Sequence, residues 1–347
     1  MQPTTQSTTI LHAGSRALNL IVVLVLTALL AAPTSADEIE LILGDVSMNK
    51  LPFVMALDEG IYERNGLEVT PKFSRGSVDI IRASGINVPD AYIHDGKSSP
   101  LVKIGGATPH FTRLTMRAGS WNPIALGSTH LTSRWRIVSR ADIESPADLK
   151  GKRIGFSGVG AVTHFMAISF AEHMGWDPNL DWSMMSDALG VDALDDGYVD
   201  AIIAPELHAT MAVAAGYKIL VDLGDYNFPV AGSAFLFDRE WLADNHDEAE
   251  RLIKSYVEAI ALLKTDKEAT FRALRKWFQM TDEDLMEFFY LEAKKLPSKP
   301  YAPAEGLKKM MQIYDSHEMR KYALGDFYDD SYVKALDDSG YIDSLYE

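Results

Sequence analysis

Short apolar runs alternate with amphipathic stretches over the first two thirds of the chain. The amphipathic stretches predict helices at 51–60, 77–83, 161–174, 190–196 and 207–215. The apolar runs predict strands at 39–43, 67–73, 90–93, 152–156, 182–185, 201–204 and 218–223. Such alternation is typical of mostly parallel sheets with helices on both faces, so the pattern predicts an α/β protein.

The pattern changes after the apolar run 234–237. Beyond it the chain is almost purely helical in pattern, with the strongest helical stretches at 248–263, 267–278, 282–293 and 304–316. Because an amphipathic helix must bury its apolar face, we expect these helices to cover a core that the earlier segments build.

The segment SPADLKGKRIGFSGVGAVTHF, residues 145–165, predicts a strand, a glycine turn and a helix. Ser145 can cap a short helix that Gly151 ends. The turn then places backbone N–H groups at the start of a second helix, where they favour a ligand oxygen or a negative charge. A plain strand-to-helix connection explains the same pattern equally well.

Several catalytic motifs fail in this turn. The dinucleotide fingerprint needs a third glycine where Thr163 stands, and the hydrolase elbow needs a glycine where Val159 stands. Ser157 is therefore not predicted to be a nucleophile, and no catalytic residue is predicted elsewhere. The run starting at His317 has a lysine where a zinc-protease motif needs its second histidine, so no metal site and no cofactor are expected.

The amino terminus has the pattern of a secretory signal peptide. Arg16 precedes an apolar run at 18–32, which is shorter than the ~20 residues that span a bilayer, and Thr34-Ser35-Ala36 has small residues for cleavage. We predict cleavage after Ala36 and a soluble periplasmic protein. An uncleaved anchor is the alternative, which Pro33 disfavours.

The net charge and the cysteine content limit the kinds of binding partner and covalent modification that we expect. The formal net charge is −16, which argues against nucleic acid and anionic membranes as partners. The chain has no cysteine, hence no site for a lipid anchor and no disulfide, and its length allows a core large enough without one.

Four segments resemble periplasmic solute-binding proteins of ABC importers, in the branch similar to alkanesulfonate, nitrate and thiamine-pyrimidine binding proteins. They are MALDEGIYERNGLEV (55–69), IESPADLKGKRIGFSGVGAVTHFMA (143–167), DALDDGYVDAIIAP (192–205) and DFYDDSYVKALDDSGYID (326–343). The chain departs from the family pattern at SGINVPDAYIHDG, residues 84–96, which leaves the first-lobe contacts less defined.

The resemblance implies a type II periplasmic binding fold. It consists of two lobes with doubly wound mixed sheets, joined by a two-strand hinge, with the C-terminal helices packed on the first lobe. The implied boundaries are a signal peptide at 1–36, a first lobe at 37–135 and 235–347, and a second lobe at 136–234. The hinge is expected near 131–139 and 232–237.

The resemblance also implies that a ligand lies between the lobes and meets the ends of strands and the glycine turn. The candidate ligand-binding residues are Met48, Asn49, His94, Asp95, Ser157, Gly158, Val159, Gly160, Ala161, Thr163, Glu206 and His208. Helix capping explains Asn49 and Thr163 equally well, and Asp95-Gly96 is an ordinary turn pair. Lone histidines such as His94 and His208 are more often packed or solvated, and Glu206 suits the first turn of any helix.

The implied function is capture of a small molecule and its delivery to an ABC permease by a monomer that does not insert into the membrane. The alternatives are a periplasmic sensor subunit and an enzyme similar to the thiamine-pyrimidine synthases, whose cysteine-rich motif is missing here. The candidate loops carry few cations, Lys50 and Lys97, beside Asp95 and Glu206. This balance favours a neutral or nitrogen-bearing ligand, pyrimidine-like, aromatic or another small organic molecule, over a sulfonate.

Overall fold

A computed structural model describes residues 1, 38–44, 46–82, 88–94, 96, 101–119, 121–129 and 134–347. Of these, Glu38–Glu347 form one compact unit. The predicted signal peptide lies outside the described residues except for Met1, as does its cleavage site. Within the described ranges, no helix combines the length and the apolar character needed to cross a bilayer.

The first sheet has the strand order β3-β2-β1-β4-β11-β5. Its first four strands in this order run parallel, whereas β11 is antiparallel to both of its neighbours. The strands are β1 Ile39–Leu43, β2 Val69–Ser74, β3 Ile93–His94, β4 Val102–Gly106, β5 Pro123–Ser128 and β11 Ser233–Asp238. We call this sheet with its helices the first lobe.

The second sheet has the order β10-β6-β9-β7-β8, in which β6 is antiparallel to β9 and β10. Side chains alternate between its two faces: Ile137 and Ile203 enter one core cluster, whereas Val138 and Ile202 enter another. The sheet is thus covered on both sides, and we call it with its helices the second lobe. Its strands are β6 Trp135–Ser139, β7 Arg153–Gly155, β8 Ser183–Met185, β9 Ala201–Pro205 and β10 Lys218–Asp222.

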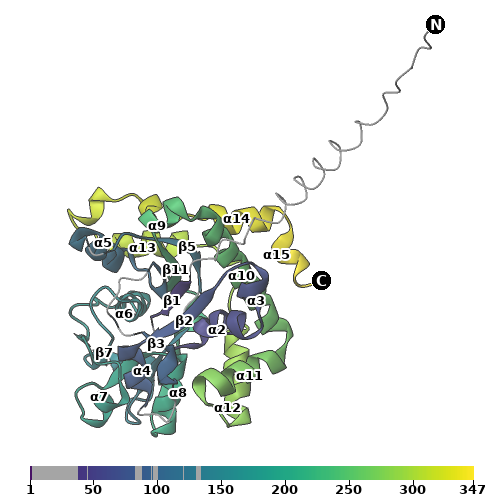
Figure 1. Ribbon diagram of the computed structural model, residues 1–347. Helices are drawn as coiled ribbons and strands as arrows, with labels where there is room; N and C mark the ends of the chain where they lie inside the picture. Colours follow the sequence, from purple (N-terminus) through teal and green to yellow (C-terminus); the bar gives the residue numbers. More distant parts are fainter. Residues whose placement is uncertain are drawn as a thin grey trace. The chain divides into compact units, whose positions relative to one another are not determined.

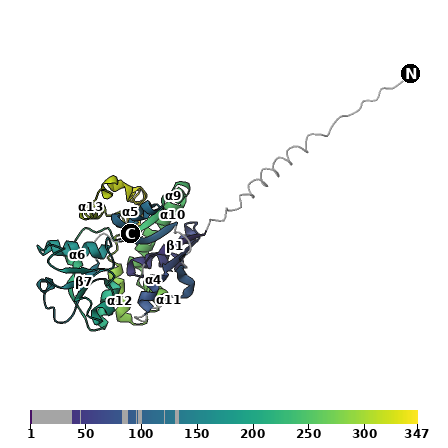
Figure 2. The same ribbon diagram turned by 90° about the vertical axis from the view of Figure 1, so that its left-hand side faces the viewer.

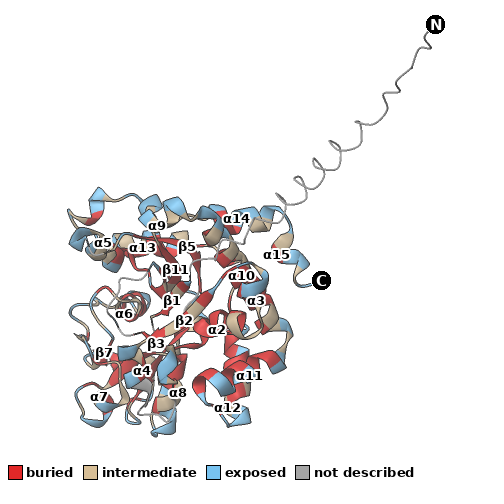
Figure 3. Cartoon of the chain, viewed as in Figure 1, coloured by how far each residue is buried: buried red, intermediate tan, exposed pale blue. Residues whose placement is uncertain are grey.

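Helices cover the first sheet with a large core of aliphatic and aromatic side chains. Phe53, Tyr256 and Phe235 stack or meet edge to face there, with ring centroids 4.5–5.8 Å apart. Buried residues are concentrated along α2, α10 and α11, whereas α5 has buried, intermediate and exposed residues (Figure 3). These helices are α2 Leu51–Asp58, α3 Ile61–Arg64, α4 Arg75–Arg82, α5 Pro109–Ala118, α9 Arg239–Asp244, α10 His246–Thr265, α11 Lys267–Phe278, α12 Glu283–Ala293, α14 Ser331–Asp338 and α15 Tyr341–Ser344.

The second lobe uses fewer and shorter helices. They are α6 Val162–His173, α7 Val191–Asp195 and α8 Glu206–Ala214. In Figure 1, α6 and β7 lie to the left of β1 and α11 lies to its right, and in Figure 2 α6 and β7 again lie to the left of β1, with α11 below it. Short 3₁₀ helices complete the chain: η1 Met48–Lys50, η2 Asp90–Tyr92, η3 Pro146–Leu149, η4 Leu223–Tyr226, η5 Met319–Lys321 and η6 Leu324–Asp326.

One C-terminal helix, α13 Ala304–Ile313, packs differently from the others. Its Leu307 and Met310 join the second-lobe core that contains Phe165 and Val230. At Gly306 a side chain would come within 2.9 Å of the backbone of residues 230 and 231, so this helix lies directly on the segment that returns to the first sheet. After α13, the chain rejoins the first lobe through the bridge between Ala125 and Tyr328.

The predicted α/β class with two mixed sheets is confirmed. The pattern failed to predict β4, β5 and α5, and it read residues 145–149 as the start of an ordinary helix where the structure has the 3₁₀ helix η3. The sheets are joined by residues 129–134, of which 130–133 are not described, and by 223–232. The residue boundaries of the lobes stay a prediction.

Candidate functional site

A cavity of about 280 Å³ opens between the two lobes. The first lobe contributes residues that follow β1 and β4 and Ser77 within α4, and the second lobe contributes the glycine turn and the start of α8. Because both lobes supply the wall, any change in their relative position alters the cavity. It is lined by Val46, Ser47, Asn49, Ser77, Gly106, Thr108, Phe111, Arg134, Trp135, Ser157, Ala161, Val162, Thr163, Leu189, Pro205, Glu206, His208 and Ser233.

A buried ion pair forms one part of this wall. Arg134 Nη2 donates to Glu206 Oε1 at 2.8 Å, and the two side chains are 7% and 4% exposed. Glu206 Oε1 also accepts the backbone N–H of Met48 at 3.3 Å, which links the second lobe to the first. Arg134 Nε and Nη1 are buried and have no hydrogen-bond partner among the described residues. Unpaired buried donors are costly, so this guanidinium retains unused binding capacity.

A polar network surrounds Asn49 in η1, which follows β1. Its Nδ2 donates to Thr129 Oγ1 at 2.8 Å, and its Oδ1 accepts from Ser47 Oγ at 2.5 Å and from Lys50 Nζ at 3.0 Å. Lys50 is fully buried, and its Nζ also donates to Ser233 Oγ at 3.4 Å. The network fixes the Asn49 side chain in the wall, and α2 begins beside it without a side-chain cap.

The glycine turn is held by its own side chains. Thr163 Oγ1 accepts the Ser157 N–H at 3.0 Å and shares a hydrogen bond of 2.7 Å with Ser157 Oγ. The N–H groups of Gly160 and Ala161 donate to His164 Nδ1 and to the Gly158 carbonyl. The backbone amides of Ser157, Gly160 and Ala161, which were expected to face a ligand, therefore already donate hydrogen bonds within the turn. The cavity wall here is left to the side chains of Val162 and Thr163 and to the hydroxyl groups of Thr163 and Ser157.

Gly160 contacts the first lobe rather than the cavity. Its carbonyl accepts the Thr108 hydroxyl at 2.8 Å in a buried hydrogen bond. Its φ is +84°, and a side chain there would come within 2.3 Å of the His110 ring. Thr108 and His110 lie at the start of α5, so the turn is one of the places where the lobes touch.

Two histidines and a tyrosine lie behind the turn. His164 stacks on Phe156 with ring centroids 4.8 Å apart, and its Nδ1 lies 2.9 Å from Tyr314 Oη. Burial lowers the pKa of His164, and the neighbouring His110 lowers it further. Burial, followed by Arg113, lowers the pKa of His110. Since Nδ1 accepts the Gly160 N–H, we assign the proton of neutral His164 to Nε2.

Residues 124–269 match the family model described as NMT1/THI5 like. This range runs from β5 into α11 and includes the ion pair and the glycine turn, whereas Asn49 and Thr108 lie before it. At the level of sequence, no curated protein matches the chain.

Solved structures share the fold of the chain. The periplasmic nitrate-binding protein NrtA from Synechocystis PCC 6803 superposes with a TM-score of 0.65 at 13% identity, covering 90% of this chain and 91% of that one. The periplasmic aliphatic sulphonate binding protein SsuA from Escherichia coli gives 0.59 at 19% identity, with 81% and 91% covered. The desulfurization enzyme DSZB gives 0.57 at 16%, with 87% and 99% covered. The chain has the two-lobed fold of periplasmic binding proteins.

The structure brings six of the predicted site residues to the cavity wall: Asn49, Ser157, Ala161, Thr163, Glu206 and His208. Five other predicted site residues do not line the cavity: Met48, His94, Gly158, Val159 and Gly160. Met48 is buried and takes part through its backbone, and Val159 is exposed at 58%. Asp95 lies outside the described residues.

His94 is held away from the cavity by acidic and basic neighbours. Its Nδ1 lies 2.8 Å from Glu40 Oε1, and Glu40 Oε2 pairs with Lys72 at 2.8 Å. The three residues lie on the neighbouring strands β3, β1 and β2, so cross-strand pairing accounts for His94.

The sequence interpretation missed Arg134, Trp135, Thr108, Phe111 and Ser233. Arg134 had a usable signal, because an arginine directly before the buried strand β6 must find a partner or a ligand. Thr108 also had one, since a threonine before a proline is a common helix start, and it does cap α5 by accepting the Phe111 N–H.

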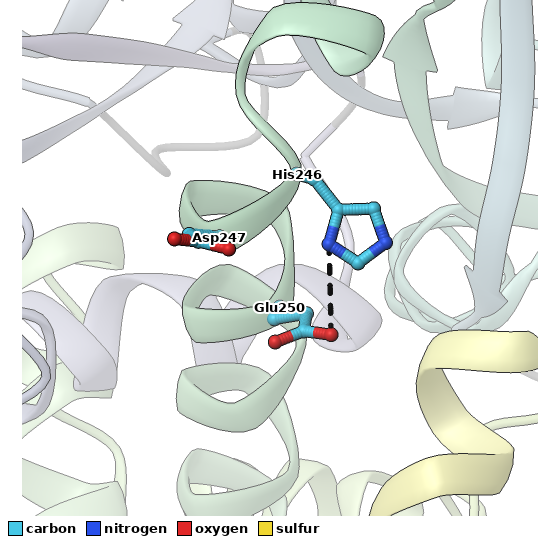
Figure 4. A group of neighbouring side chains, drawn as sticks. All are labelled: His246, Asp247 and Glu250. Carbon is cyan, nitrogen blue, oxygen red and sulfur yellow. Dashed lines mark ion pairs between the residues drawn. The ribbon is translucent and has the colours of Figure 1, made fainter.

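A group of His246, Asp247 and Glu250 at the start of α10 could geometrically hold a metal ion (Figure 4). All three are exposed, and His246 Nδ1 pairs with Glu250 Oε1 at 3.6 Å one helical turn away. Acidic residues in a first turn stabilise the helix by themselves, so this group carries no functional argument.

Proposed function

We propose that the chain is an extracytoplasmic solute-binding protein that captures a small organic molecule between its lobes and delivers it to an ABC-type import permease. The observation that carries the proposal is the cavity of about 280 Å³ whose wall comes from both lobes and contains a buried, incompletely bonded ion pair. A site of this kind binds a ligand and couples its presence to the lobe arrangement. The shared fold of NrtA and SsuA supports the same function.

An enzymatic function is the second candidate, because DSZB is an enzyme with the same fold. The polar groups of this cavity favour binding over covalent catalysis. The Ser157 hydroxyl is bonded to Thr163, and the sequence contains no cysteine to act as a nucleophile. Activation of a serine requires a general base within hydrogen-bond reach, which the contacts of this hydroxyl do not provide.

The test is a thermal-shift screen of the purified chain without residues 1–36 against amino acids, amides, pyrimidines, aromatic acids and sulfonates. A ligand at 100 times its Kd should raise the free energy of unfolding by about 2.7 kcal/mol, which corresponds to several degrees in Tm. Hits are then incubated with the protein and followed by mass spectrometry. Unchanged ligand after hours supports binding without turnover, whereas conversion of a hit supports the enzyme.

Delivery is tested in cells of the source organism. Deletion of the coding sequence should abolish uptake of the identified ligand, and expression of the full chain should restore it. Normal uptake after deletion would contradict the import proposal even if the ligand binds tightly in vitro.

A further inference from the structure

The ion pair in the cavity wall leaves hydrogen-bonding groups of both kinds unused. Arg134 uses Nη2 on Glu206 and, in the part of the chain that the structure describes, has no partner for Nε and Nη1, although its side chain is nine-tenths buried. Among the described residues, the hydrogen bonds of the Glu206 carboxylate go to Oε1, which leaves Oε2 as a further acceptor. Two donors and one acceptor thus lie side by side.

The charge of this wall is balanced. Among the described residues that line the cavity, Arg134 and Glu206 are the ones that carry a fixed charge, and they form a single pair. Lys50 does not line the cavity, and its ammonium group donates to Asn49 and Ser233. A simple anion on Arg134 would lie next to the Glu206 carboxylate, and a simple cation on Glu206 next to the guanidinium. Each would meet a like charge at short range in a medium that screens poorly.

The rest of the wall is largely apolar. Val46, Phe111, Trp135, Val162 and Leu189 face the same cavity as the ion pair. A ligand that fits both parts has a compact apolar body and one polar end. Its polar end needs an acceptor oxygen for Arg134 next to an N–H donor for Glu206.

We propose that the ligand has no net charge at neutral pH and carries an acceptor oxygen beside an N–H donor, as in an amino carboxylate zwitterion or an amide. Arg134 and Glu206 are the residues that select it. This inference rests on the proposed function, because it describes the ligand of the same cavity. The wall discriminates against lone carboxylates, sulfonates and amines by leaving one member of the ion pair facing a like charge.

The experiment measures the Kd of matched probes by isothermal titration calorimetry. The probes share methyl, isobutyl or phenyl bodies and differ in the head group: amino carboxylate, amide, carboxylate, sulfonate or amine. We expect the amino carboxylate or the amide of at least one body to bind ten times more tightly than its charged counterparts. Comparison of the amino carboxylate with the amide also distinguishes a zwitterionic ligand from an uncharged amide.

The Glu206→Gln variant tests the role of the charge balance. It keeps the side-chain volume but gives the wall a net positive charge, so the preference should invert: the neutral probe weakens at least tenfold and the carboxylate or sulfonate tightens. A purely structural role of Glu206 would weaken all probes alike. The matched control is Asp200→Asn, which alters the partly exposed Arg153–Asp200 pair outside the cavity and should leave the preference unchanged.

If Glu206→Gln does not fold, the double variant Arg134→Met, Glu206→Leu removes both charges together, a change that cores often tolerate. It should melt cooperatively and lose the tight neutral probe at least tenfold. Tighter binding of a carboxylate, sulfonate or amine by the unaltered protein overturns the inference but leaves the proposed function standing. Failure of every probe and of the wider screen overturns both.

Discussion

Gly160 shows how one residue can join two lobes. Its backbone lies in the left-handed region, its carbonyl accepts the Thr108 hydroxyl, and its α-carbon faces the His110 ring. The sequence pattern suggested that this glycine lets the backbone approach a ligand. The structure indicates instead that it lets the second lobe approach the first.

Gly160→Ala should therefore destabilise the protein. The new methyl group meets His110 at 2.3 Å, and the positive φ adds strain, so we expect a loss of about 1–3 kcal/mol in the free energy of unfolding by urea denaturation. Gly158→Ala is the matched control, because nothing lies within 4 Å of its added atom. Equal stability of the two variants would contradict this account.

For single residues, the sequence predicts which ones lie at the site better than it predicts which residues they contact. Asn49, Thr163 and Glu206 follow strands or begin helices, and the places where strands end are visible in the pattern. The Arg134–Glu206 pair joins residues far apart in sequence, and no local pattern specifies such a pair. The use of the Gly160 amide by His164 depends on side-chain orientation in the folded chain, which is likewise not encoded locally.

Among the elements, the short ones were hardest to predict. β4 ends in two glycines and β5 mixes a proline and a glycine with its apolar residues, so neither has the period of a regular strand. The long helices α10 and α11 have clear amphipathic periods and were predicted to within two residues. The pattern could not show that α13 packs on the second-lobe core and not on the first-lobe core, because both cores offer the same apolar surface.

Three elements, α5, α6 and α13, meet through His110, His164 and Tyr314. Because the pKa of His164 is lowered on folding, the unfolded chain binds its proton at a higher pH than the folded chain does. The stabilising effect of neutral His164 is complete above the unfolded pKa of about 6.5 and is lost as the pH falls through the lower folded value.

We therefore expect the free energy of unfolding to decrease between pH 7.5 and pH 5. The charged groups around His164 are His110 and, at the adjoining groove, the Lys309–Glu172 pair. His164→Asn keeps an acceptor for the Gly160 N–H without titrating, so its urea-derived stability should depend less on pH over this range. A variant as sensitive to pH as the unaltered protein would place the titration elsewhere.

For the whole molecule, contacts among the described residues that connect the lobes include the hydrogen bonds from Thr108 to Gly160 and from Met48 to Glu206 at the cavity, and the ion pair between Arg136 of β6 and Glu292 of α12. The two hydrogen bonds describe a closed arrangement, whose opening would break both and admit a ligand. The crossing segments span few residues in the sequence, 129–134 and 223–232, so we expect a rotation of the lobes to need backbone changes at few positions.

Ligand binding should accordingly reduce the radius of gyration measured by solution scattering. Thr108→Val removes the hydroxyl that donates to Gly160, so the closed form loses about 0.5–1.5 kcal/mol and ligand affinity falls roughly three- to tenfold. Thr108→Ser retains a hydroxyl and should bind nearly as the unaltered protein does. A ligand that binds tightly without any contraction, in a protein that is open beforehand, would contradict closure.

The packing of α13 on residues 230–231 bears on how the two lobes can move. A third stretch of chain, after the two crossing segments, runs from the second core back to the bridge at Ala125, so we expect it to act as a strap that limits how far the lobes separate. If the chain binds a ligand as proposed, fluorophores attached on the two lobes should change their separation when the ligand binds. Such a labelled chain would then report ligand occupancy.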